Sequence, residues 1–166
     1  RQIWHRTEAF ETATYVLLGV TAGAALPFVA RWDLGAQAGD SAKAAITRTE
    51  AQLANASLSD DQRAQIAINL LGVRKLDATI VPAVARLVTG EASPALKRRV
   101  IDALGNTDDA GAGEAMLAAL PTLDFELREA AFGQLLKRAD WSSAAVQALA
   151  DKKFDTRLLG PANLHR

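Results

Sequence analysis

The sequence contains no cysteine, and this absence excludes several classes of chemistry at once. Disulfides, thiolate zinc sites, thiol catalysis and covalent haem attachment all need cysteine side chains. The redox compartment stays open, because a chain without cysteine suits either side of a membrane.

Histidine is almost as scarce, with only His5 and His165 at opposite ends of the chain. A zinc site or a Ser-His-Asp arrangement needs histidines that converge with other groups. No serine stands in a Gly-x-Ser-x-Gly elbow. We therefore predict no catalytic, cofactor-binding or metal-binding residue, no cofactor, and no enzymatic activity.

The chain also lacks an excess of either charge, since nineteen basic residues balance nineteen acidic ones. Proteins that bind nucleic acid usually carry a basic footprint, so we predict no nucleic-acid partner. The densest basic run is 97–99 (Lys-Arg-Arg), which we interpret as a solvated helix face.

One uncharged stretch, Thr12 to Ala30, is about long enough for a minimal membrane-spanning helix. It contains three threonines, two glycines and Pro27, and many of its other residues are alanine. Its drive to insert into a membrane is therefore weak. We expect two short buried helices here rather than a membrane span, and the start of the chain shows no signal-peptide pattern.

Aromatic residues make up only 5% of the chain, and the apolar content is mostly alanine and leucine. These residues favour helices, whereas strand formers are sparse, so the sequence predicts an all-α fold. The clearest helix starts are the capping box of Ser59 with Gln62, the pair Ser93-Pro94, and Asp124. We expect a turn at 35–40 and helices over about 7–19, 24–34, 41–56, 60–72, 78–88, 94–105, 110–120, 125–137 and 141–150, with another starting at Gly160-Pro161. The apolar face of helix 41–56 is predicted as Ala44, Ala45, Ile46 and Leu53, and that of helix 78–88 as Ile80, Val84, Leu87 and Val88.

A repeat runs through these helices. Leu71, Leu104 and Leu136 recur at nearly equal intervals along the chain, and a looser copy occurs at Leu34-Gly35. Apolar residues recur four positions before each of the three and thirteen positions after it: Ala67, Val100 and Phe132 before, and Val84, Leu117 and Leu149 after. Helix pairs that recur at a short, regular period bury their apolar faces by stacking, which is typical of an α-solenoid. The repeats are clearest over 59–157, and residues 1–58 are irregular.

Residues 93–154 read like HEAT repeats, and the segment 119–149 carries a more specific resemblance. It is similar to the HEAT-like region of large secreted planctomycete and verrucomicrobial proteins, over about 60–166. In that family the region joins a dehydrogenase-like propeller to a c-type haem domain, which implies a periplasmic or cell-surface location. The family's Cys-x-x-Cys-His motif is absent here, so any redox role would belong to other domains. The matching positions are Leu120, Pro121 and Leu123, then Arg128 and Ala131, then Arg138 and Trp141, and finally the start of a closing helix at 158–166.

Three further motifs have structural explanations. Asp60-Asp61 and Asp108-Asp109 are expected at helix starts, where acidic groups complement the helix dipole, rather than at a metal. Gly111-Ala112-Gly113 lacks a preceding strand, so we interpret it as a close helix–helix turn rather than a dinucleotide site. Trp141 is expected in a turn, packed under the neighbouring unit, whereas Trp4 and Trp32 suit either the core or a partner domain.

The sequence therefore predicts a single HEAT-like repeat domain over 1–166, as a piece of a longer polypeptide. We expect a non-catalytic scaffold whose partners are proteins or neighbouring domains of the same chain. The concave face is predicted to come from the second helix of each pair, with Arg86, Glu114 and Gln147 exposed on it. The alternative is a ligand- or glycan-binding module that uses the groove of the solenoid, which a cluster of exposed aromatic residues would favour.

Overall fold

The computed structural model describes residues 35–154. Within this range the protein contains seven α-helices, one short 3-10 turn and no strand, so the predicted all-α class is confirmed for the described residues. The expected helices before residue 34 and after residue 154 lie outside this range, as do His5, Trp4, Trp32, Phe28, His165 and the uncharged stretch 12–30. The helices are α2 (Gly35–Leu53), α3 (Asp60–Gly72), α4 (Ile80–Thr89), α5 (Pro94–Gly105), α6 (Ala110–Ala119), α7 (Phe125–Leu135) and α8 (Ala139–Ala150), with the 3-10 turn η1 at Leu120–Thr122.

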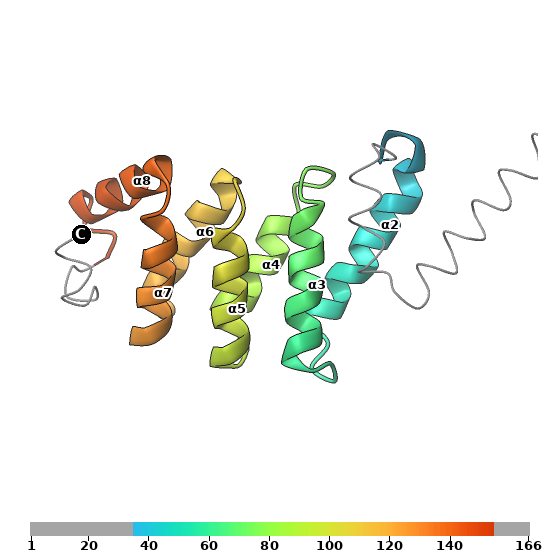
Figure 1. The fold of residues 1–166 in the computed structure, drawn as a ribbon, viewed down its shortest axis with the longest axis horizontal. Helices are drawn as coiled ribbons and strands as arrows, with labels where there is room; N and C mark the ends of the chain where they lie inside the picture. The colour runs from blue at the N-terminus through green and yellow to red at the C-terminus, as the bar shows by residue number, and fades with distance from the viewer. Residues whose placement is uncertain (1–34, 155–166) are drawn as a thin grey trace, which may run out of the picture.

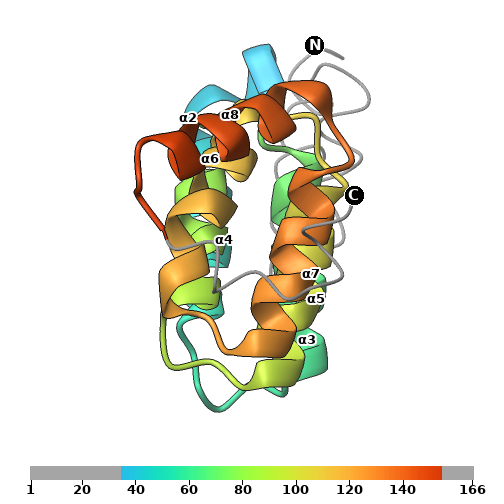
Figure 2. The ribbon, with the colours of Figure 1, turned by 90° about the vertical axis from the view of Figure 1, so that its left-hand side faces the viewer.

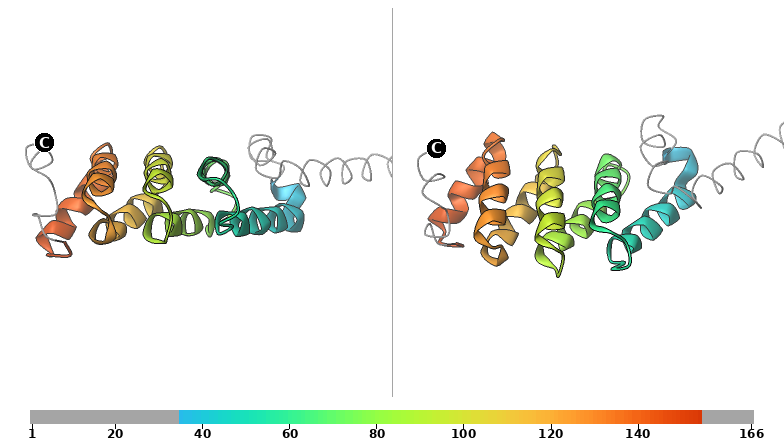
Figure 3. Two further views of the ribbon diagram at one scale, coloured as in Figure 1. Left: turned by 90° about the horizontal axis from the view of Figure 1, so that it is seen from below. Right: turned by 60° about the horizontal axis from the view of Figure 1, so that its bottom comes forward.

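The helices form two layers (Figure 1). One layer consists of α3, α5 and α7, which lie side by side in chain order. The other consists of α2, α4, α6 and α8 and lies behind the first, as the view along the array shows (Figure 2). Seen from below, the two layers appear as two rows (Figure 3). Successive helices therefore alternate between the layers.

The core lies between the two layers. The fully buried large side chains come from both layers, among them Leu70 of α3, Leu96 of α5, Ile80 of α4 and Met116 of α6. The predicted stripe of α4, which is Ile80, Val84, Leu87 and Val88, is buried. Ala67, Val100 and Phe132, the residues that recur four positions before the repeat leucines, are buried as well. Removal of this apolar surface from water is the main term that holds the layers together.

Local capping chemistry fixes where the helices of the first layer begin. Ser59 accepts a hydrogen bond from the backbone N–H of Gln62, whose side chain accepts one from the backbone N–H of Ser59, so the predicted capping box is confirmed. Ser93 accepts from the N–H of Leu96 at the start of α5, and Pro94 occupies the first helical position. Asp124 caps α7 in the same way. All three predicted starts are correct.

The predicted turn at 35–40 is wrong, because α2 already begins at Gly35. Alanine and glutamine fill the positions after this glycine, and extending an existing helix costs much less than nucleating one. Glycine in a helix costs only about 1 kcal/mol relative to alanine, which does not stop the helix. Ala44 is exposed, contrary to the prediction, and Thr49 is buried on this helix instead.

Helix α2 ends at Leu53 rather than continuing to Ala56. The side chain of Asn55 accepts hydrogen bonds from both the backbone N–H and the hydroxyl of Ser57, and this local turn competes with the helix. The carbonyl of Leu53 accepts a hydrogen bond from Nε of Arg63, at 2.8 Å. The end of α2 is therefore tied to α3.

A similar arginine contact occurs between α6 and α7. Helix α6 ends at Ala119, next to its predicted end at 120, and Pro121 lies in the 3-10 turn η1 that follows. The carbonyl of Leu120 accepts a hydrogen bond from Nε of Arg128 at 3.0 Å. Arg63 and Arg128 each stand four positions after the capping residue of their helix, and both tie a helix of the first layer to the C-terminal end of the preceding helix.

Helix α8 ends in a Schellman motif with lysine at the left-handed position. The N–H of Lys153 donates to the carbonyl of Ala148 and that of Lys152 to the carbonyl of Leu149, and φ of Lys152 is 56°. Glycine takes this conformation without the clash that Cβ causes. We expect Lys152→Gly to raise the free energy of unfolding by about 0.5–1 kcal/mol in urea denaturation. Lys152→Ala keeps the strain and should change little, whereas an equal gain from both would show that the lysine charge matters instead.

Candidate functional site

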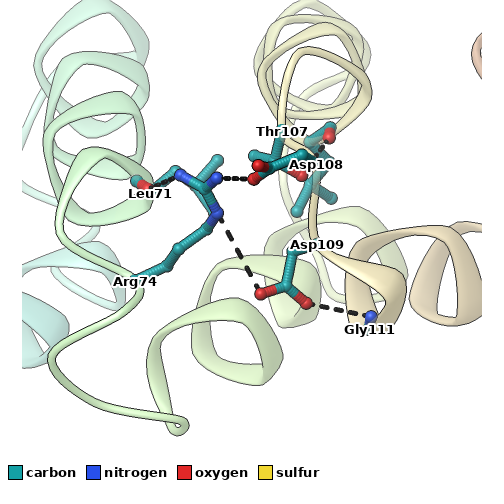
Figure 4. Close-up of polar contacts among 7 residues, drawn as sticks. Leu71, Arg74, Thr107, Asp108, Asp109 and Gly111 are labelled. Atoms are coloured by element: carbon teal, nitrogen blue, oxygen red, sulfur yellow. Dashed lines mark hydrogen bonds and ion pairs between the residues drawn. The ribbon is translucent and has the colours of Figure 1, made fainter.

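A cluster around Arg74 joins the turn after α3 to the turn before α6 (Figure 4). The guanidinium of Arg74 forms an ion pair with Asp108, and its Nε lies 4.0 Å from Oδ2 of Asp109. It also donates to the carbonyl of Leu71 at 3.0 Å. Asp109 in turn caps α6, accepting from the N–H of Gly111 at 2.9 Å. The arginine is thus satisfied by helix-end groups, and the cluster serves as a joint between two units.

Similar contacts join the other units. Ser93 donates to Asp60 across 33 residues of sequence, and Arg99 pairs with Asp61 across 38. Between α5 and α7, Nε2 of Gln134 donates to Oδ1 of Asp102 at 2.7 Å across 32 residues. Together with the pair of Arg74 and Asp108, these contacts join helices at sequence separations of 32 to 38 residues.

The acidic pairs lie where the sequence predicted them. Asp60 and Asp61 form the first turn of α3, and Asp108 and Asp109 precede α6. Each of the four contacts a serine, an arginine or a backbone N–H. Over residues 35–154, no group of three or more His, Cys, Asp or Glu side chains is placed to hold a metal ion.

The basic run 97–99 lies on the surface of α5. Arg98 pairs with Asp102 within its own helix at 3.4 Å, and Arg99 pairs with Asp61 of α3. Exposed pairs of this kind contribute little to stability. The run is a solvated helix face, as predicted, with both of its arginines already paired.

Asp77, in the loop between α3 and α4, has a pKa below its ordinary value. Its carboxylate accepts hydrogen bonds from the backbone N–H of Thr79 at 2.9 Å and from the Thr79 hydroxyl at 2.8 Å, and these bonds favour the charged form. The Thr79 hydroxyl also lies 3.0 Å from Oε1 of Glu50 on α2. Asp77 therefore shapes the entry into α4.

The prediction that Gly111-Ala112-Gly113 forms a turn is wrong, because all three residues lie inside α6. Gly113 is buried against the indole of Trp141, and a β-carbon at Gly113 would lie 2.6 Å from Cδ1 of the ring. The glycine therefore lets α8 approach α6 closely, which is a helix–helix contact rather than a turn.

Trp141 lies in the first turn of α8, not in the turn before it. Its packing under the neighbouring unit is confirmed, since the ring is 3% exposed and contacts α6. The guanidinium carbon of Arg138 lies 5.0 Å from the ring centroid, within the range of a cation–π interaction. Among the described residues, none offers the buried Nε1 a hydrogen-bond partner. The indole is thus the main anchor of α8.

Three grooves mark the surface of the described part of the chain. One, about 470 Å³, lies between α2 and α4 and is lined by Glu50, Arg86 and, from α3, Arg63. A second, about 430 Å³, runs between α3 and α5. A third, about 380 Å³, lies between α4 and α6 beside Arg74 and Glu114. The grooves therefore lie between neighbouring helices of one layer, where a partner can reach them.

Exposed apolar side chains are scattered rather than clustered. Ile68 is 44% exposed on α3, Leu76 39% in the loop after it, Phe125 55% at the start of α7, and Val146 64% on α8. Single exposed apolar residues are common on protein surfaces. Of these four, only Ile68 lines one of the three grooves.

The residues predicted to line the second-helix face, Arg86, Glu114 and Gln147, all reach the surface. Arg86, Glu114 and Gln147 are all exposed. Arg86 and Glu114 also line two of the three grooves. Sequence reasoning missed Arg74, Gln134 and the contact of Gly113 with Trp141. The signal for Gly113 was available, because a glycine inside a predicted helix often marks a close approach of two helices.

Among residues 35–154, no helix is both long and apolar enough to cross a membrane. Comparison with family models, with curated proteins and with solved structures gives no match to this chain.

Proposed function

We propose that the chain is a HEAT-like α-solenoid that acts as a non-catalytic scaffold within a larger protein. The observation that carries the proposal is the series of contacts one repeat apart, such as Ser93 with Asp60 and Gln134 with Asp102. A stacked array is joined by such nearest-neighbour contacts between equivalent positions, and it gains rigidity from them. The similar hydrogen bonds from Arg63 and Arg128 to backbone carbonyls at the end of the preceding helix support the same interpretation.

The wider setting of the proposal rests on the sequence resemblance alone. It assigns the scaffold to a secreted, redox-related protein at the periplasm or cell surface, with the neighbouring domains of the same polypeptide as partners. The complete reading frame tests this setting directly. A propeller before this segment and a Cys-x-x-Cys-His motif after it are expected, and unrelated neighbours would remove the redox setting.

Under this proposal, the partner binds the face of the second helices, on which Arg86, Glu114 and Gln147 reach the surface. A photo-crosslinking residue placed at each position in the parent protein should give the same crosslinked domain or protein by mass spectrometry. Glu126 is exposed at the start of α7 in the other layer and provides the matched control. Crosslinks from Glu126 alone, or from none of the three positions, would contradict the proposed face.

The alternative function, glycan binding, has less support. Sugar-binding grooves commonly stack sugar rings on exposed aromatic side chains. In the described part of the chain, Phe132, Trp141 and Phe154 are buried, and only Phe125 is largely exposed. Phe125 does not line any of the three grooves. The cluster of exposed aromatic residues that would favour this function is therefore missing over residues 35–154.

A further inference from the structure

The groove between α3 and α5 is lined by both apolar and charged residues. Ile68, Leu71 and Ala103 provide apolar surface, whereas Arg74, Arg99 and Asp102 provide both signs of charge. Gly72 also lines the groove, at the end of α3, and apart from its own helix backbone and chain neighbours no atom of the described residues lies within 4 Å of the position that its β-carbon would take. The groove is therefore open above this glycine.

The next interface along the array has an equivalent glycine, and there the space is filled. Gly105 ends α5 as Gly72, one repeat earlier, ends α3. A β-carbon at Gly105 would lie 2.5 Å from Cδ of Gln134, a side chain of α7 that is only 7% exposed. The Gln134 amide donates to Asp102 at 2.7 Å and accepts from Nζ of Lys137 at 2.7 Å. A carboxamide thus occupies the position above the glycine.

The repeat explains why the first groove lacks such a group. Leu104 and Leu136 are equivalent positions in successive repeats, so the residue of α5 that corresponds to Gln134 is Asp102. Aspartate is one methylene shorter than glutamine. Its carboxylate is directed to Gln134 and to Arg98, at 2.7 and 3.4 Å. Asp102 therefore lines the first groove without filling the space above Gly72.

We propose that the α3–α5 groove binds a carboxamide, supplied by a glutamine or asparagine side chain of a protein partner. The inference extends the proposed scaffold function, because it assigns a second contact on the first layer. An amide is neutral and dipolar, so its N–H groups suit the carboxylate of Asp102 while its oxygen suits the guanidinium of Arg99. Because the groove is lined by both positive and negative side chains, it suits a dipolar ligand better than a ligand with a net charge. The methylenes of the same side chain lie over Ile68 and Ala103.

A titration of the whole chain with blocked single amino acids tests the groove. N-acetyl-glutamine N-methylamide is added to the nitrogen-15-labelled protein, and the amide signals of Gly72, Ala103 and Asn106 are followed by NMR. We expect these signals to shift with a dissociation constant of about millimolar order, as suits so small a ligand. The blocked glutamate analogue lacks the N–H donors and should bind about tenfold more weakly, because it loses the equivalent of one hydrogen bond. The blocked leucine analogue lacks both the donors and the acceptor and should bind more weakly still.

Two matched variants show whether the probe binds in the groove. Gly72→Leu places a side chain in the open space and should abolish the shifts. Gly133→Leu, on α7, is the control, because its β-carbon position also has no atom within 4 Å and it does not line the groove. Absence of shifts, equal binding of all three probes, or shifts that persist in Gly72→Leu would each overturn the carboxamide site. None of these results would affect the scaffold proposal, which the crosslinking experiment tests separately.

Discussion

Replacement of Trp141 by alanine is expected to lower the free energy of unfolding by about 3–5 kcal/mol, the usual cost of removing a large buried aromatic side chain. The indole is 3% exposed and fills the space beside Gly113 of α6. Alanine leaves a cavity there and removes the main contact of α8 with the preceding unit. Urea denaturation followed by circular dichroism measures the loss. Because α8 packs mainly against α6 and α7, amide exchange should accelerate most in α8.

Trp141→Phe is the informative control for this prediction. It keeps an aromatic ring in the site but removes Nε1–H, a buried donor without a partner in residues 35–154. An unsatisfied buried donor costs about 1–3 kcal/mol, so its removal offsets part of the volume lost with the smaller ring. We expect a loss below about 1.5 kcal/mol for Trp141→Phe. An equally large loss in both variants would mean that the indole N–H is in fact satisfied, and a small loss in both would mean that Trp141 does not anchor α8.

The parts of the fold that follow from short-range chemistry were predictable from the sequence. Ser59, Ser93 and Asp124 cap helices through hydrogen bonds to residues three positions later, and such a pattern is visible in any linear sequence. The stripe of α4 was equally clear, because its spacing matches the helical period. Local signals of this kind led to the correct positions for α3, α4 and α5. The predicted boundaries of these helices differ from the observed ones by at most two residues.

The errors concern features that depend on packing. We predicted turns at 35–40 and at Gly111-Ala112-Gly113, two segments that contain glycine, which commonly marks turns. In the structure both segments are helical, and Gly113 is used for a close approach to a ring of α8, far along the chain. Composition alone does not distinguish a glycine that breaks a helix from one that lets another helix approach.

The contacts between units were also beyond sequence reasoning. Arg74, Asp102 and Gln134 are ordinary surface residue types, and nothing in their immediate neighbours assigns them a partner 32 or 34 residues away. Once the repeat is aligned, however, these separations become the expected ones. The proposed repeat therefore helps to interpret the candidate surfaces, although it did not identify the residues that join neighbouring helix pairs or that line the grooves between them.

Gly113→Ala is expected to lower the free energy of unfolding by about 1–3 kcal/mol, although alanine is the better helix former. The new β-carbon would lie 2.6 Å from Cδ1 of Trp141, so the indole or the whole of α8 has to move. The ring is buried and rigid, and its displacement costs packing on both helices. Urea denaturation of the variant beside the unmodified chain measures the change.

Gly133→Ala provides the matched control, because Gly133 also lies inside a helix but has no atom within 4 Å of its β-carbon position. Here only the helix propensity changes, so the variant should gain about 0.5–1 kcal/mol. Combining Gly113→Ala with Trp141→Phe should cost less than the sum of the two single changes, since the smaller ring leaves room for the methyl group. If the two glycines respond alike, the close approach of α8 to α6 is absent in solution. The expected result is instead that Gly113→Ala lowers the free energy of unfolding while Gly133→Ala raises it, with a smaller cost of Gly113→Ala in the Trp141→Phe background. That result would show that Gly113 serves the contact between α6 and α8. The proposed scaffold depends on contacts of this kind.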